Sequence, residues 1–266
     1  MNKALLFTKR NIKEMLRDPL IYIFCAGFPI AMVLLFQIIL HYAQDKTPIF
    51  EVKSLIPGIM VFSYSILMLM SSLLISKDKS SAFLKRLYTS PMKGRDYIIG
   101  YFIPFFIIGL IQSVLCIILG YIFGATSNTG FIPFHKSLLL ILVMIPIMTM
   151  NILIGMIFAT ILNDKSAPGI SSIFISLSGI IGGAWMPLET MGSFEVIASC
   201  FPFYPSVYLG RVITHASHVV PDEFGNVTYY VFSDRGLLFL LITFGYLIVF
   251  GLLTILFFNK RLKNDC

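Results

Sequence analysis

Charged residues are scarce in this chain of 266 residues. Aspartate, glutamate, lysine and arginine make up 12% of it, whereas hydrophobic residues make up 57%. A soluble domain carries about twice that fraction of charged residues. The few charges also gather in short blocks between long apolar runs, which is typical of membrane-protein loops and not of a surface that binds nucleic acid. We therefore expect a membrane protein with no nucleic-acid partner.

Cysteine is also rare, and the four cysteines have neither the CxxC spacing nor the Cys/His spacing of a metal site or a disulfide framework. His215 and His218 are spaced HxxH, but no third ligand lies near them in the sequence, which favours coincidence over a metal site. The sequon at Asn226 matters only in a host with a secretory pathway. We predict no bound metal.

Motifs for catalysis and nucleotide binding are missing as well. The sequence has no GxxxxGK[ST] loop to cradle phosphates, no GxSxG and no HExxH. We therefore expect that the chain is not an enzyme and that it binds no cofactor itself.

Six long segments contain no aspartate, glutamate, lysine or arginine, and each approaches or exceeds the roughly 20 residues that cross a bilayer as a helix. The segments are 20–40, 54–76, 97–124, 137–162, 168–188 and 236–258. Backbone amides in a bilayer must bond within their own segment, and the alternation of a β-barrel is absent from the sequence. The predicted fold is all-α and polytopic, with six transmembrane helices.

The basic residues indicate the orientation of these helices. Fifteen of the 20 lysines and arginines lie before the first span, in the second and fourth connections or after the last span. Only five lie in the other connections. Because cytoplasmic loops carry the excess of positive charge, we predict that both termini are cytoplasmic in a multi-pass protein of the plasma membrane.

Residues 1–19 are predicted to form an amphipathic helix along the inner membrane surface. Apolar side chains share one side of this helix at about 100° per residue, and basic side chains occupy the other. Asp18-Pro19 ends the helix and turns the chain into the membrane. The following apolar run is too long for a signal peptide and lacks a cleavage site, so we expect it to be retained.

The inner connection 77–96 has the features of a docking element. A serine can cap a short helix there, a proline ends it, and an apolar face stands among six basic residues. A solvated basic loop is the alternative, but the capped helix with its apolar face favours docking. The candidate residues are Ser80, Ser81, Phe83, Leu84, Arg86, Leu87 and Pro91.

Residues 189–235 are predicted to form a re-entrant segment followed by an external loop. The piece after Leu188 is apolar but short and interrupted by prolines, as in segments that enter a membrane and leave on the same side. The marker residues are Pro187, Glu189 and Pro202. The stretch 211–235 is polar and is predicted to be the external loop.

Four features in this order resemble the membrane subunits of type-2 ATP-binding-cassette (ABC) exporters. They are the helix ending Leu16-Arg17-Asp18-Pro19, the inner loop from Ser81 to Pro91, the turn Leu162-Asn163-Asp164-Lys165, and Gly182 to Glu189 followed by Phe201-Pro202 and Arg211. Together they extend over nearly the whole chain. The short outer loops resemble the drug- and antibiotic-exporting branch.

The resemblance implies partners that supply what the sequence lacks. Two permease subunits, identical or sister chains, would sit on a dimer of separate ATPase subunits, which bind the ATP and magnesium. The segment from Ser80 to Pro91 would be the ATPase-coupling element. The second and fifth spans would line the path, which nominates Tyr64, Met68, Phe174 and Ser178. The cargo would be an amphiphilic small molecule or peptide (a drug, an antibiotic or a lipid-like compound) moved out of the cell.

Two other classes of function are compatible with the same composition. A membrane-embedded immunity or sensor protein would bind a ligand without transporting it. A lipid-modifying membrane enzyme would need a cluster of polar residues at one membrane face. An ATPase encoded beside this chain would favour the exporter.

Overall fold

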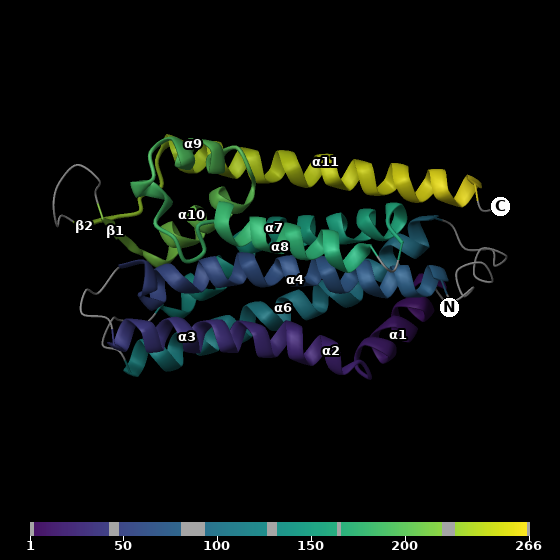
Figure 1. Cartoon of the computed structure of the whole chain (residues 1–266), viewed down its shortest axis with the longest axis horizontal. Coiled ribbons are helices and arrows are strands. Elements are labelled where there is room, and N and C mark those ends of the chain that lie inside the picture. The colour runs from purple at the N-terminus through teal and green to yellow at the C-terminus, as the bar shows by residue number, and fades with distance from the viewer. Residues whose placement is uncertain are drawn as a thin grey trace.

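The computed structural model describes residues 3–42, 48–80, 94–126, 132–163, 166–219 and 227–264 as an elongated bundle of helices (Figure 1). Both terminal helices reach the same end of the bundle, called the near end below, and the opposite end is the far end. The long helices are α3 (Phe28–Tyr42), α4 (Val52–Ser80), α6 (Gly94–Thr126), α7 (Phe134–Ile161), α8 (Ala167–Ile181) and α11 (Asp234–Asn264).

Within the described residues, five helical segments are long and apolar enough to cross a membrane, and they match five of the six predicted spans. The first, Pro19–Tyr42, joins α3 to two short pieces, α2 (Pro19–Ile21) and the π-helix η1 (Tyr22–Gly27). The all-α, polytopic fold predicted from the sequence is confirmed.

The fifth predicted span, 168–188, is wrong at its end. Helix α8 has 15 residues and stops at Ile181, so it is about 22 Å long, shorter than a hydrocarbon core of about 30 Å. Gly182 caps the helix, and Gly183 has φ +58°, a left-handed conformation that favours glycine. Residues 182–188 therefore leave the helix instead of completing a sixth long span.

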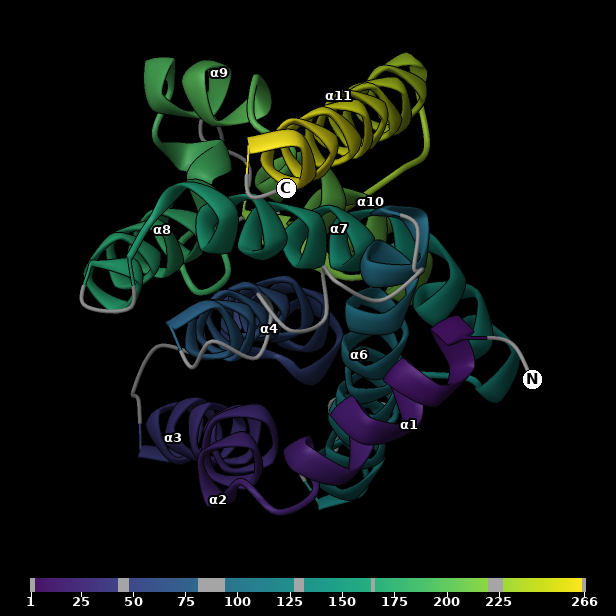
Figure 2. The same ribbon diagram turned by 90° about the vertical axis from the view of Figure 1, so that its right-hand side faces the viewer.

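Helix α4 is the central helix of the bundle, with α3, α6, α7 and α8 around it (Figure 2). In the most apolar stretch of α4, 89% of the residues are buried, against 17% in the most apolar stretch of α11. Gly155 allows α7 to lie directly against α4, because a side chain at this position would overlap the carbonyl oxygen of Met68. A helix surrounded in this way can pass a displacement at one end to every neighbour.

The amphipathic helix α1 (Lys3–Met15) lies across α6 at the near end (Figure 2). Phe7 packs edge-on against Tyr97 and Tyr101, with ring centroids 6.0 and 4.8 Å away. The break after α1 falls where the sequence predicted it. The carboxylate of Asp18 accepts a hydrogen bond from the Leu20 amide at 3.0 Å, and Pro19 starts the next helix.

The far end holds the segment predicted to be re-entrant. It comprises η3 (Leu188–Thr190), α9 (Ser193–Ser199) and α10 (Phe203–Thr214), and α9 and α10 meet at 95°. The stretch 211–235 is predicted to be a loop, but it also contains the end of a helix and two strands. Arg211 belongs to α10 and is fully buried, and the strands β1 (Ser217–Val219) and β2 (Val227–Tyr229) pair in antiparallel register.

Three prolines in the spans, but not Pro146 of α7, mark places where separate segments are tied together by a side chain among the described residues. Each lacks an N–H, so the carbonyl four residues earlier loses its usual helical donor. A polar side chain from another segment donates to that carbonyl in all three cases. For Pro29, Gln112 donates to Cys25 at 2.8 Å. For Pro57, Thr214 donates to Lys53 at 2.6 Å, and for Pro104, Asn11 donates to Gly100 at 3.0 Å.

We predict that this pairing can be measured in a double-mutant cycle on Gln112 and Pro29. Gln112→Leu should cost about 1–3 kcal/mol in the free energy of unfolding, because it leaves the buried Cys25 carbonyl without a donor. Pro29→Ala restores a backbone N–H, so Gln112→Leu should cost much less in that background. Thermal unfolding of the four detergent-solubilised proteins is the measurement. Equal costs in both backgrounds would show that the side chain does not replace the missing donor.

Candidate functional site

The predicted docking residues begin where α4 ends, at the near end of the bundle. Ser80 is the last residue of α4, and its hydroxyl donates to the Lys77 carbonyl at 3.0 Å. The remaining candidates, Ser81, Phe83, Leu84, Arg86, Leu87 and Pro91, lie outside the described residues. Their role stays a prediction. The segment that they belong to continues from the end of α4, the most buried of the span helices.

An ion-pair network fixes the near end of α4 to α1 and α6. Asp78 is 2% exposed, and both of its carboxylate oxygens accept hydrogen bonds from Arg10, at 2.7 and 2.9 Å. Tyr101 of α6 donates to the same carboxylate at 2.8 Å. Glu14 adds a contact to Arg10 at 2.7 Å and a longer one to Lys77 at 3.8 Å. Two-pronged pairing of this kind holds α1 in a defined position against α4.

The four residues nominated for the path lie within the chain's own packing. Tyr64 and Met68 are fully buried, and the Tyr64 hydroxyl is 2.6 Å from Ser113 of α6. Ser178 is 1% exposed and accepts a hydrogen bond from Ser65 at 2.7 Å. Phe174 is partly exposed. Their role in a path stays a prediction. The exposed face of α8 consists of other residues, including Ile170, Ile173, Leu177 and Ile180.

Arg211 is the centre of the far end. Its buried guanidinium donates to two backbone carbonyls, that of Gly183 at 2.7 Å and that of Ser54 at 3.3 Å. It thereby joins α10 to the turn after α8 and to the first turn of α4. Its counter-charge is Glu189, 3.7 Å away, and the side chain of Glu189 is only 9% exposed. A buried charge is tolerated only when it is paired in this way.

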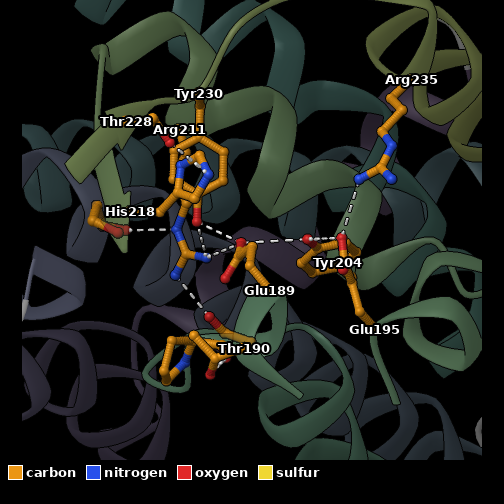
Figure 3. A network of polar contacts seen from close by, with 12 residues as sticks. Glu189, Thr190, Glu195, Tyr204, Arg211, His218, Thr228, Tyr230 and Arg235 are labelled. Atoms are coloured by element: carbon orange, nitrogen blue, oxygen red, sulfur yellow. Dashed lines mark hydrogen bonds and ion pairs between the residues drawn. The ribbon is translucent and has the colours of Figure 1, made fainter. Parts of the chain in front are cut away.

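Tyrosines extend this pair into a network, in which the carboxylate of Glu189 lies between Arg211 and Tyr204 (Figure 3). Tyr230 and Tyr204 both donate to Oε1 of Glu189, Tyr204 at 3.3 Å. Tyr204 also lies 3.1 Å from Glu195, which is paired with Arg235 at 3.5 Å. Burial raises the pKa of the Tyr230 phenol, so it stays protonated and acts as a donor at neutral pH.

A small cavity of about 180 Å³, called the far-end cavity below, lies beside this network. Its polar lining consists of Ser54, Glu189, Thr190, Ser217, His218 and Tyr230. Its apolar lining consists of Pro48, Ile49 and Pro187. Desolvation lowers the pKa of His218 below its ordinary value, so the imidazole is neutral at pH 7.

The structure separates the sequence-predicted residues of the far end into different roles. Pro187 and Glu189 line the cavity, whereas Pro202 immediately precedes α10. His215 ends α10 with φ 51°, while His218 faces the cavity. Among the residues that the structure describes, no group of three or more histidine, cysteine, aspartate or glutamate side chains is placed to hold a metal. Asn226 lies outside the described residues.

Sequence reasoning missed the pairing of Arg10 with Asp78 and the network around Tyr204 and Tyr230. Asp78 lies two residues after an uncharged span, and this position is the one feature that could have marked it. The tyrosines carried no comparable mark, because their partners lie 15 and 41 residues away in the chain.

We predict that Arg211→Gln destabilises the protein by about 3–5 kcal/mol, because the change leaves the Glu189 charge and two carbonyls without their buried donor. Arg235→Gln is the matched control, since its side chain is 70% exposed, and it should cost less than about 1 kcal/mol. Thermal unfolding followed by the fluorescence of Trp185, the only tryptophan, measures both. Equal melting temperatures for the two variants would contradict the assignment of Arg211 as the far-end anchor.

Comparisons with known proteins agree with this architecture. The family model for the ABC-2 type transporter matches residues 3–214, which extend from α1 through the far-end anchor to the last residue of α10. No individual protein of established function gives a significant sequence match. Because the family model includes most of the chain, the protein belongs to the ABC-2 type transporter family and is a membrane permease subunit of an ABC transporter.

Proposed function

We propose that this permease exports an amphiphilic small molecule or peptide, driven by ATP hydrolysis on a separate ABC ATPase subunit. Two permease subunits, identical or sister chains, would pair in the plasma membrane above an ATPase dimer. ATP and magnesium would bind to those partners. The family membership supports the association with an ATPase, whereas the pairing and the outward direction are our inference.

The position of the predicted coupling segment is the observation that supports this proposal best. The segment follows Ser80, the last residue of the central helix α4. Any force applied to it would act directly on α4, which touches the four surrounding span helices. Because α1 grips the same end through Asp78, a shift of the segment would also move the amphipathic helix. The chain would thus couple ATPase motion to the spans without binding nucleotide itself.

The exposed face of α8 is the surface that we propose for the partner permease and the path. It combines apolar residues with the exposed hydroxyls of Ser172 and Ser176. A mixed surface of this kind suits an amphiphilic cargo better than a uniformly apolar, lipid-facing helix does. The path residues nominated on α4 would reach the cargo only if α4 and α8 separate.

We predict that Phe83→Asp with Leu84→Asp uncouples the transporter. Docking would remove water from the two new carboxylates, which would cost roughly several kcal/mol in binding free energy. Recovery of the ATPase subunit on co-purification and substrate-stimulated ATP hydrolysis should both fall, while the spans still insert. A double mutant that inserts normally, keeps its ATPase partner and still exports would show that the segment is only a basic connector.

Lys9→Gln with Lys13→Gln is the matched control for this experiment, because both side chains are exposed on α1 and exposed charges contribute little. Lys79 is unsuitable as a control, although it is closer to the segment. Its ammonium group donates to the Leu162 carbonyl at 2.9 Å and so fixes the near ends of α4 and α7 together.

We predict that the near end of the bundle lies in the cytoplasm and the far end on the outer side, as the distribution of basic residues indicates. A reporter fused after Cys266 should report the cytoplasmic side, and one inserted between positions 220 and 226 should report the outer side. If both reporters indicated the cytoplasmic side, or if their sides were reversed, the topology and the direction of export would be contradicted.

A further inference from the structure

Glu189, which lines the far-end cavity, has a carboxylate oxygen without a partner among the described residues. Oε2 of Glu189 is buried and unpaired among the described residues, whereas Oε1 receives the tyrosine and arginine donors. The Ser54 hydroxyl and Nδ1 of His218 line the same cavity and are likewise buried and unpaired within the described chain. Buried polar atoms are nearly always hydrogen-bonded, so these three atoms point to a ligand that the chain does not supply.

The other polar groups of the wall have already used their hydrogens. Tyr230 donates its hydroxyl hydrogen to Glu189, Thr190 donates to the Pro187 carbonyl at 2.8 Å, and Ser217 donates to Glu51 at 3.4 Å. The Tyr230 oxygen already accepts from Arg211 at 3.4 Å, so it is the Thr190 and Ser217 oxygens that still offer free lone pairs. The cavity is therefore rich in acceptors, and it suits a ligand that brings several hydrogens.

Charge points in the same direction. The cavity lining contains the carboxylate of Glu189 and, among the described residues, no lysine or arginine. The guanidinium of Arg211 lies on the Oε1 side of the carboxylate, where it is held by the Gly183 and Ser54 carbonyls. A second carboxylate, that of Glu51, lies behind Ser217. The opposite wall of prolines and Ile49 is apolar and suits an alkyl group.

We propose that the far-end cavity is a binding site for a small protonated primary amine. An ammonium group carries three donors and no acceptor, and Glu189 Oε2, Ser54 and His218 have the three unpaired atoms to receive them. His218 accepts through Nδ1 in the tautomer whose proton is on Nε2, the nitrogen 3.1 Å from the Thr228 hydroxyl. A cavity of about 150 Å³ holds a benzene molecule, so the 180 Å³ here accommodates a short alkylamine. The placement of this site on the outer side rests on the proposed topology, whereas binding itself does not.

The test uses the full chain, purified in detergent without an ATPase subunit. Three probes of similar size are compared at neutral pH and equal ionic strength: n-butylamine, tetramethylammonium and n-butanol. A ligand that binds only the folded state raises the melting temperature, and Trp185, two residues before Pro187, reports unfolding next to the cavity. Only n-butylamine, which combines charge with N–H donors, should raise it.

Two serines of α4 provide a matched pair of variants. Ser54 and Ser63 are both buried, and both hydroxyls are unpaired, but only Ser54 lines the cavity. Neither Ser54→Ala nor Ser63→Ala removes a side-chain hydrogen bond made within the described residues, so both should fold. Ser54→Ala should weaken n-butylamine binding roughly tenfold, and Ser63→Ala should leave it unchanged. Glu189→Gln should abolish binding, and Ser54→Ala decides the matter if Glu189→Gln does not fold.

Equal stabilisation of the Ser54→Ala and Ser63→Ala variants by n-butylamine would overturn the proposal. So would an equal response to n-butylamine and tetramethylammonium, because N–H donors would then be irrelevant. No response at all would also overturn it, since the cavity would then hold only water. Because the experiment needs neither ATPase nor transport, its failure would leave the coupling proposal untouched. Conversely, a failed coupling experiment would leave this site standing.

Discussion

The bundle depends on the requirement that every backbone carbonyl in a membrane finds a donor. Prolines break that requirement locally, and the chain repairs it with side chains that come from elsewhere. Asn11 of α1, Gln112 of α6 and Thr214 of α10 each reach a carbonyl that a proline has left without its helical partner. Helices surrounded by lipid gain little from hydrophobic contact with each other. These donations therefore help to fix three pairs of neighbours, α1 with α6, α6 with the first span, and α10 with α4, alongside the close packing of the other helices.

Arg211 extends the same principle with a charge. It satisfies carbonyls at the start of α4 and just after α8, and it is neutralised by Glu189 at the beginning of the re-entrant segment. The short length of α8 makes this anchor necessary. A helix that stops before crossing the bilayer leaves its terminal carbonyls inside the protein, where a buried donor must meet them. The re-entrant segment supplies that donor and closes the far end.

The sequence predicted the helical spans well because an uncharged run of about 20 residues has few other stable structures in lipid. It failed at Ile181, where the apolar run continues to Leu188 although Gly182 and Gly183 end the helix. It also assigned Arg211 to a loop, because a charge next to a polar stretch resembles an external position. The Glu189, Tyr204 and Tyr230 network was beyond sequence reasoning, since nothing in the local pattern of these residues indicates that they meet.

The two ends of α4 are held by bonds of different strength, and this difference sets where the bundle opens most easily. At the far end, Arg211 is fully buried, so separating it from Glu189 would leave a charge without water or partner. At the near end, the side chain of Arg10 is 34% exposed, so water can replace Asp78 as its partner, and the buried Asp78 keeps Tyr101 as a donor when the pair separates. Local opening therefore costs less at the near end. A force applied after Ser80 would tilt α4 about its far end, which moves the inner part of the helix away from α8 before the outer part.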